Sequence, residues 1–301
     1  MVNKMKDTWS ENVFSAVVHV IIVILTLTIL YPFYYCVVLS FNDGADTLLG
    51  GIYLWPRVFT MENYKFVFSN NDIYIAARTS VLRTAVGIIS ALFVTSMAGY
   101  VLSKSFLGFR KVYMVYMLIT MFFGGGLIPY ILVIRSLGLY NNFLVYIIPN
   151  LFSVWYCILF MSFFRALPDS LEESAKIDGA NDFYIFIRII LPLSKPVLAT
   201  IALFVGVGHW NSWFDNMLFA SQDDQLQTLS FVLQKMINNQ KFLDEILRTK
   251  NLGVGAQTVS GMTSTSLRLA TMVVTAFPIM VLYPFLQKYF VTGVMIGSIK
   301  G

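Results

Sequence analysis

Long stretches without a charged residue are the strongest constraint on how this chain can fold. Six of them contain at least 19 residues each with no Asp, Glu, Lys or Arg. A helix that crosses the hydrocarbon core of a bilayer needs about 20 mostly apolar residues, so each stretch is long enough, within a residue or two, to span a membrane. We therefore predict an all-α membrane protein with six transmembrane helices, at about residues 13–41, 76–103, 112–135, 139–164, 196–217 and 268–290.

The composition excludes a soluble protein of this length. Charged residues make up 12% of the 301 residues and hydrophobic residues 57%, whereas about 25% of a typical soluble domain is charged. The net charge of +5 therefore points to membrane orientation rather than to nucleic-acid binding. The two cysteines and two histidines suggest no metal site. The chain has no Gly-x4-Gly-Lys-Ser/Thr phosphate loop, so we expect no cofactor bound by it and no ATP bound through that motif.

Six spans place both chain ends on one side of the membrane. Eleven of the 21 Lys and Arg residues lie on that side, and five of the other ten lie in the long segment 215–268. Because short loops decide orientation, we predict cytoplasmic termini. The chain is then a single transmembrane domain, 1–301, with a cytoplasmic loop at 165–195 and outer loops at 42–75 and 218–267. The apolar run Val13–Leu30 lacks a following cleavage site, so we expect an uncleaved span rather than a signal peptide.

The cytoplasmic loop is predicted to form two short helices joined at a glycine. Ser170 and Glu173 have the spacing of a capping box, and Gly179 suits the left-handed residue that closes a helix. Asn181 or Asp182 can cap a second helix, which Pro192 is expected to end. Apolar residues recur at helical spacing in this second helix: Phe183, Phe186, Ile187 and Ile190.

This loop resembles the "EAA" loop of permeases in bacterial ABC importers. The family pattern is Glu-Ala-Ala-x3-Gly-x9-Ile-x-Leu-Pro, and this chain departs from it only at Ser174. In that family the loop docks in a cleft of the ATPase subunit and transmits its closure to the spans. The residues to which the resemblance assigns this coupling are Glu173, Ser174, Ala175, Asp178, Gly179, Ile189, Leu191 and Pro192.

The resemblance extends beyond the loop. Trp210-Asn211 matches a Trp-Asn pair of the carbohydrate branch, which includes the maltose-type systems, and the ending 287–301 looks like that branch's tail. The run Phe123–Tyr130 looks like permeases for complex oligosaccharides, including pectin-type sugars.

The resemblance implies the type I permease fold and a subunit, not itself an enzyme, of an ATP-driven carbohydrate importer in a bacterial cytoplasmic membrane. The implied partners are a second homologous permease, two ATPase subunits that use ATP and Mg, an extracytoplasmic solute-binding protein, the carbohydrate and membrane lipid, with no nucleic acid.

Polar and aromatic residues within the spans are candidates for a substrate pathway, because aromatic faces stack on sugar C–H groups while amides and carboxylates bind hydroxyls. Gly124, Gly125 and Gly126 should break or kink span three, either to expose backbone groups to the pathway or to permit close helix packing. The full set of candidates is Gly124, Gly125, Gly126, Tyr130, Asn150, Trp155, Trp210, Asn211, Trp213, Asp215 and Asn216.

The residues of span five have two interpretations. In a continuous helix His209, Trp213 and Asn216 share one face, and Asn211 and Asp215 share another, so only one group can line the pathway well. Alternatively, the whole cluster lies at the outer interface, where tryptophan is enriched. Arg78 and Arg83, just before the charge-free part of span two, are expected to extend to the same interface. The alternative is that they attract acidic oligosaccharides.

Two other functions remain as alternatives. An ion-gradient-driven sugar transporter usually carries ionisable residues at mid-span, and none lies centrally in the six stretches. A membrane-embedded enzyme would need clustered acidic residues, and the only cluster, in the cytoplasmic loop, fits the coupling motif better.

Overall fold

The computed structural model describes residues 9–239 and 262–296, with side chains described as far as Pro284. The described residues are mainly helical, and the one β-bridge among them joins Asn42 to Phe59. The chain divides into two compact units, one made of residues up to 69 with 239–274 and the other of 70–238 with 275–301. We describe each unit by itself.

The first unit contains α1 (Trp9–Ser40), α2 (Gly44–Leu48), α3 (Glu62–Ser69) and the first part of α15 (Ser264–Ile296). Val38 and Leu39 at the end of α1 pack against Ile52 and Leu269. The buried amide of Asn63 donates to the carbonyl oxygens of Ser40 and Asn42 at 2.9 and 3.2 Å. These contacts attach α3 to the end of α1.

The second unit is built around α4 (Asn71–Ser103), against which α7 (Val154–Arg165) and α11 (Lys195–Asn211) pack. Gly99 permits the close approach to α7, since a Cβ there would lie 2.7 Å from Cβ of Phe160. The three helices enclose an apolar core that includes Ala91, Phe160 and Ile201. The core holds the second unit together through the hydrophobic effect.

The third predicted span is broken. The chain bends by 112° between α5 (Arg110–Phe122) and α6 (Leu127–Ser136), across residues 123–126. Gly126 has φ +87 and ψ 171, a conformation that is essentially restricted to glycine. The predicted break at Gly124–Gly126 is therefore confirmed.

Two other helix pairs bend without a glycine run. The 3-10 turns η1 (Phe143–Tyr146) and η2 (Ile148–Asn150) precede α7, and the chain bends by 48° between them and this helix. The chain bends by 84° between the helical segment Asp182–Leu193 and α11. In the described residues, three helices are long and apolar enough to cross a membrane (Trp9–Ser40, Asn71–Ser103 and Ser264–Pro284), and up to six if each bent pair counts as one span.

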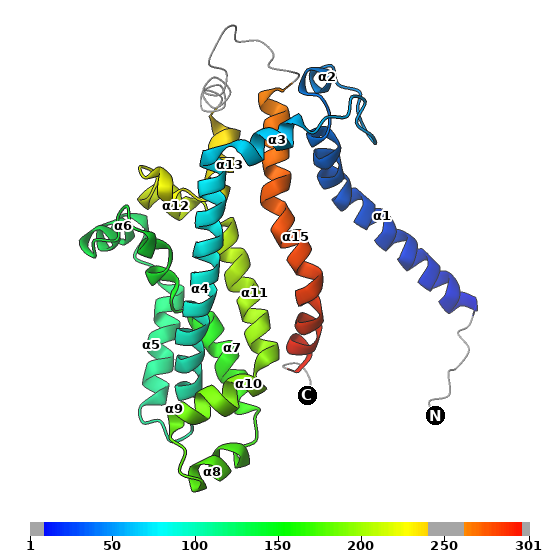
Figure 1. The fold of residues 1–301 in the computed structure, drawn as a ribbon. Coiled ribbons are helices and arrows are strands. Elements are labelled where there is room, and N and C mark those ends of the chain that lie inside the picture. The colour runs from blue at the N-terminus through cyan, green and yellow to red at the C-terminus, as the bar shows by residue number, and fades with distance from the viewer. Residues whose placement is uncertain (1–8, 240–261, 297–301) are drawn as a thin grey trace. The chain divides into compact units, whose positions relative to one another are not determined.

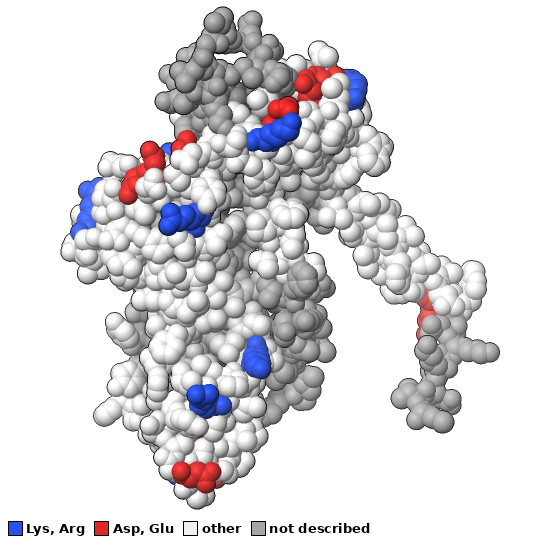
Figure 2. Space-filling model, viewed as in Figure 1, with Lys and Arg blue, Asp and Glu red and all other residues white. Residues whose placement is uncertain are grey.

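The remaining elements lie at the two ends of the second unit (Figure 1). α8 (Ser170–Ile177), α9 (Asp182–Ile185), the π-turn η3 (Phe186–Ile190) and α10 (Leu191–Leu193) form one end. α12 (Phe214–Phe219), η4 (Asp224–Leu226) and α13 (Leu229–Asn238) belong to the other. On the visible face, charged side chains gather at these ends and an uncharged band separates them (Figure 2), as expected for a membrane-crossing unit.

Candidate functional site

The loop that carries the EAA-like motif forms the predicted helix–turn–helix. α8 closes at Gly179, which has φ +83, and the N–H of Ala180 donates to the carbonyl of Ala175 at 2.9 Å. This geometry satisfies the last carbonyls of the helix and is available to glycine without strain. Of the two predicted caps of the second helix, Asn181 and Asp182, the structure has Asn181, whose side chain accepts from the N–H of Tyr184 at 2.8 Å.

Two details of the loop prediction are wrong. Ser170 is the first residue of α8 rather than its cap, and Asp169 before it makes no side-chain capping bond, so no capping box forms. Pro192 does not end the second helix, which continues to Leu193. A wider π-turn precedes Pro192 and accommodates a residue that has no N–H to donate.

The two faces of α8 differ in exposure. Glu172 and Ala175 are half-buried, whereas Ile177 is 86% exposed. Other motif residues share the outward side, namely Glu173, Ser174, Asp178 and Gly179. The later motif residues Ile189 and Leu191 instead pack against the apolar core. The motif therefore has an outward part that a partner can reach and an inward part that joins it to the helices.

Glu172 attaches α8 to the end of α4. Its carboxylate forms an ion pair with Lys104, and both side chains are largely buried, at 16% and 15% exposed. The Tyr100 hydroxyl donates to the same carboxylate at 3.4 Å, and the Lys104 ammonium lies 4.2 Å from the Tyr100 ring centroid. A second ion pair joins Lys176 to Asp182 at 2.9 Å near the surface, and the hydrogen bond to Asp182 raises the pKa of Lys176.

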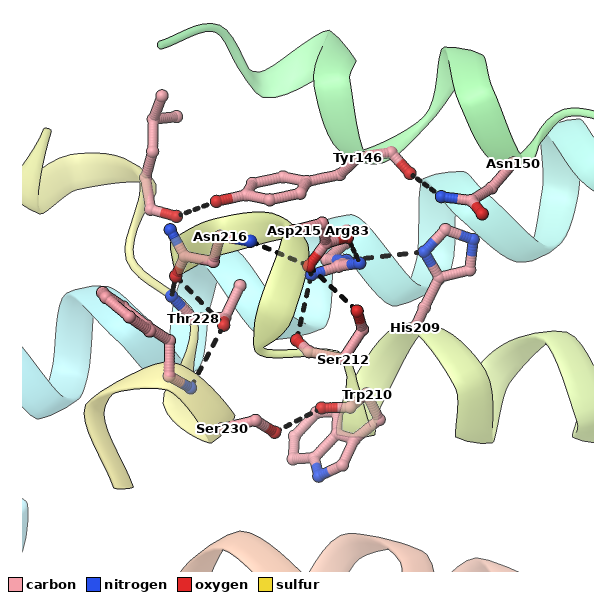
Figure 3. A network of polar contacts seen from close by, with 12 residues as sticks. Arg83, Tyr146, Asn150, His209, Trp210, Ser212, Asp215, Asn216, Thr228 and Ser230 are labelled. Carbon is pink, nitrogen blue, oxygen red and sulfur yellow. Dashed lines mark hydrogen bonds and ion pairs between the residues drawn. The ribbon is translucent and has the colours of Figure 1, made fainter. Parts of the chain in front are cut away.

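At the opposite end of the unit, Arg83 of α4 is the centre of a polar network (Figure 3). Its guanidinium forms a two-pronged ion pair with Asp215, with Nη1 3.1 Å from Oδ1. Nη1 also donates to the carbonyl of Ser212 at 3.1 Å, and Nε donates to Nδ1 of His209 at 3.5 Å. The guanidinium carbon lies 4.4 Å from the centroid of the Tyr146 ring.

The predicted extension of Arg83 to the interface is wrong, because the residue is 1% exposed. The reason is the end of α11 at Asn211: α12 begins only at Phe214, so Asp215 no longer follows the continuous helical spacing. The prediction that His209 and Asp215 lie on different faces fails for the same reason, since both contact Arg83. The gap between the helices brings them together.

Two of the other four candidates from span five, Trp210 and Asn216, hold the structure together. The indole N–H of Trp210 donates to the carbonyl of Thr275 at 2.9 Å. Asn216 is fully buried, and its side-chain oxygen accepts from the N–H of Thr228 at 2.7 Å. Asn211 is exposed, and Trp213 packs edge-on against Phe214 at 5.7 Å. These bonds leave Asp215 as the candidate of this group with the strongest link to a cavity.

A cavity of about 470 Å³ lies beside the Arg83 network, a size typical of small-molecule sites, which measure about 300–1,000 Å³. It is lined by side chains of α4, α6, η2, α7, α11 and α12, and three sequence candidates are among them: Tyr130, Asn150 and Asp215. The other candidates, Gly124, Gly125, Gly126, Trp155, Trp210, Asn211, Trp213 and Asn216, do not line it. Arg83, Tyr156, Phe204 and His209 also line it and were not in the full set of candidates; they come from α4, α7 and α11, which only the fold brings together.

The glycines of the broken span lie on the surface. A Cβ at Gly124 or Gly126 would meet nothing within 4 Å, and at Gly125 only Pro129 at an ordinary 3.7 Å. Close helix packing within the described residues therefore does not explain them. Among the same residues, no group of three or more His, Cys, Asp or Glu side chains could hold a metal ion.

Comparison with known proteins gives matches over most of the chain. The family model described as "Binding-protein-dependent transport system inner membrane component" matches residues 85–296. The polygalacturonan/rhamnogalacturonan transport system permease protein YtcP of Bacillus subtilis (strain 168) is 32% identical, over 97% of this chain and 99% of its own length. Protein LplC of the same organism is 36% identical, over 91% of this chain and 90% of its own.

A solved structure supports the same architecture. One chain of a bacterial ABC transporter involved in the import of the acidic polysaccharide alginate has a TM-score of 0.84 and 28% identity to this chain. The match covers 95% of this chain and 100% of that one. The similarity thus extends over nearly the whole chain.

Proposed function

Because this chain belongs to the family of binding-protein-dependent transport system inner membrane components, we propose that it is the permease subunit of an ATP-driven ABC importer. In this proposal it carries a carbohydrate, specifically an oligosaccharide, across the cytoplasmic membrane. YtcP is the permease protein of a polygalacturonan/rhamnogalacturonan transport system, and the solved transporter is involved in the import of the acidic polysaccharide alginate. The chain makes no covalent change in its substrate, and separate subunits hydrolyse ATP with Mg.

The observation that carries the proposal is the two-sided helix α8. Its outward side ends in Ile177, an apolar side chain that is 86% exposed at the tip of a charged loop. Burying such a side chain in a partner's cleft is favourable, and Glu173 and Asp178 beside it supply polar contacts. The inward side is attached to α4 through Glu172 and Lys104. We assign the loop to docking on the ATPase.

The remaining partners follow from surfaces that the described chain leaves uncovered. None of the apolar window of α1 is buried, and α5 has no buried residue. We propose that lipid and a second, homologous permease cover these helices, that two ATPase subunits bind the cytoplasmic loops, and that an extracytoplasmic solute-binding protein delivers the sugar to the outer loops.

In this arrangement the six predicted spans place both termini in the cytoplasm. α8 then faces the cytoplasm, and the Arg83 cavity lies toward the outer side. We propose that the cavity belongs to the substrate pathway, with Tyr130, Asn150 and Asp215 among its contacts.

Purification from mild detergent tests the assembly. We expect the chain to be recovered with an ATPase, a second permease and a binding protein, and the reconstituted complex to take up sugar only with ATP. Gly179→Asp should lose the ATPase alone, because a side chain at φ +83 is strained by about 1–2 kcal/mol and displaces the outward side of α8.

Gly108→Asp is the matched control. Gly108 lies in a neighbouring loop, has no positive φ and has nothing within 4 Å of an added Cβ, so this variant should retain the ATPase. A chain that purifies alone and moves sugar into vesicles without ATP would contradict the proposal. That result would favour a gradient-driven transporter, for which the buried Arg83, His209 and Asp215 supply ionisable groups.

A further inference from the structure

The charges that line the Arg83 cavity are already paired with each other. Of its lining residues, Arg83 and Asp215 are charged near neutral pH, and the Nδ1 atom of His209 accepts a hydrogen bond from Arg83. Arg83 and Asp215 form an ion pair in which Arg83 is 1% exposed and the side chain of Asp215 is 19% exposed. The pair presents the edge of a carboxylate to the cavity and keeps the guanidinium behind it.

Arg83 has little capacity left to bind a ligand. A guanidinium has five N–H donors, and four hydrogen bonds, to His209, Ser212 and both carboxylate oxygens of Asp215, leave at most one of them for a ligand. Tyr146 covers a face of the group at 4.4 Å. An incoming carboxylate would have to displace Asp215, which is held in place by Ser212 Oγ at 2.9 Å and by the N–H of Asn216 at 2.8 Å.

The remaining groups suit hydroxyls and a flat apolar ring face. The Asp215 Oδ1 atom accepts from Arg83, Ser212 and Asn216, whereas Oδ2 accepts only from Arg83 among the described residues, which leaves an acceptor position. The side chain of Asn150 is held in place because its amide N–H donates to the carbonyl of Tyr146 at 3.1 Å. The rings of Tyr156 and Phe204 lie parallel, with centroids 6.3 Å apart, and form an apolar wall.

A second cavity in the same unit shows the contrast. It has a similar volume, about 480 Å³, and lies between α4, α11 and α15, but its lining atoms are almost all apolar. It offers no comparable set of hydroxyl partners. The Arg83 cavity is thus the one of these two that combines aromatic walls with fixed polar groups, as small-molecule sites do.

We propose that this cavity is a subsite for the uncharged, hydroxyl-bearing part of a sugar and that it does not accept a sugar carboxylate. The inference rests on the proposed function and narrows it. In an acidic oligosaccharide, the carboxylates would face away from this chain and be recognised by other subunits. A similar structure belongs to an importer of the acidic polysaccharide alginate. A substrate can therefore be acidic as a whole while the part of it that enters this cavity is uncharged.

Direct binding to the assembled complex, without the solute-binding protein, tests this inference. The two probes are digalacturonate and its dimethyl ester, which share one skeleton and differ in charge. Saturation-transfer NMR should show binding of the ester that is ~10-fold or more tighter, because a carboxylate would enter the cavity without a cation to pair it. Asp215→Asn, which releases Arg83, should shift the preference toward the acid.

Two further variants keep the test independent of Asp215. Asn150→Ala and Tyr156→Ala should each weaken binding of the ester several-fold. Asn211→Ala is the matched control, because this asparagine is exposed and does not line the cavity, and it should leave binding unchanged.

Three results would overturn the subsite: tighter binding of the acid that Asn150→Ala or Tyr156→Ala weakens, no binding of either probe, or ester binding that neither Asn150→Ala nor Tyr156→Ala changes. ATP-driven uptake by the unmodified complex is measured in parallel. If uptake persists while the subsite fails, the proposed function stands. If uptake is absent, the proposed function itself fails.

Discussion

Gly87 allows the imidazole of His209 to lie directly against α4. A Cβ at this position would lie 2.6 and 2.7 Å from the Cδ2 and Cε1 atoms of the ring, distances at which one of the two helices must shift. Gly87 is one helical turn from Arg83, so the same short segment of α4 supplies the cation of the network and the space for its histidine. A single missing side chain therefore determines how closely α11 approaches.

Gly87→Ala should destabilise the protein by about 1–3 kcal/mol, the usual cost of overpacking a core. Thermal denaturation of the purified protein in detergent measures the change. The control is Gly208→Ala in α11, where an added Cβ meets nothing within 4 Å. If both variants denature at the temperature of the unmodified protein, the close approach at Gly87 is contradicted.

The Arg83–Asp215 pair should show strong energetic coupling. Removing one member of a buried pair leaves an uncompensated charge at a cost of about 3–5 kcal/mol when burial is complete, and we expect less here because Asp215 is 19% exposed. In a double-mutant cycle with Arg83→Met and Asp215→Asn, the double variant should be less destabilised than the sum of the single variants. The free energy of unfolding is the quantity to compare.

The surface pair Arg57–Asp46 is the control for this cycle. Its atoms lie 2.8 Å apart, but the Arg57 side chain is 48% exposed, and hydrogen bonds from Asn42 and Arg57 lower the pKa of Asp46. Exposed pairs are weakened by solvent and salt, so Arg57→Met and Asp46→Asn should be nearly additive. Equal coupling in both pairs would show that burial does not govern the Arg83 network.

Among the elements, α4 connects the two functional regions of the second unit. Its last turn and the residue after it hold Glu172 of α8 through Tyr100 and Lys104, and Arg83 lies near its other end. The 33 residues of α4 form one helix, which at about 1.5 Å per residue measures about 50 Å. A displacement of α8 can therefore reach the cavity through a single helix.

Lys104→Met and Glu172→Gln should each reduce the sugar transported per ATP by roughly tenfold, because charge-assisted hydrogen bonds contribute about 1.5–3 kcal/mol. Binding of the ATPase should persist, since the outward side of α8 is unchanged. Reconstituted vesicles give both quantities. The double variant with Lys104→Glu and Glu172→Lys should recover transport.

Lys176→Met is the control for this prediction. It removes the Lys176–Asp182 pair, in which the side chains are 43% and 63% exposed, and it should have little effect on coupling. If Lys104→Met transports as well per ATP as the unmodified complex, α8 does not act on α4 through this ion pair.

At the scale of the whole molecule, the proposed orientation can be tested with an impermeant thiol reagent. In a variant with Cys36 and Cys157 replaced by alanine, Trp55→Cys should be labelled in intact cells, since Trp55 is 78% exposed in a loop that the proposed orientation places outside. Gly108→Cys, at a position where an added Cβ meets nothing within 4 Å and in a loop that the proposed orientation places in the cytoplasm, should be labelled only after the membrane is permeabilised. The reverse pattern would invert the topology.

The sequence by itself determined the features that depend on neighbouring residues. Charge-free stretches mark apolar helices because hydrocarbon excludes charge. The Gly124–Gly126 break and the turn at Gly179 were predicted because only glycine adopts those backbone angles without strain, and the cap at Asn181 was predicted from its side-chain chemistry. The motif spacing also sufficed to indicate the family, since its fixed positions lie within twenty residues.

The tertiary structure alone decided which residues share a site. Arg83 meets His209 and Asp215 across more than 120 positions, and the gap between α11 and α12 that permits this has no glycine or proline to announce it. Helical spacing assigned His209 and Asp215 to different faces. The position of Arg83 at the start of span two predicted that it extends to the interface. Likewise, only packing shows that Glu172 faces α4 while its neighbour Glu173 faces outward. Contacts between distant segments depend on where each helix ends and how it packs, which no local pattern contains.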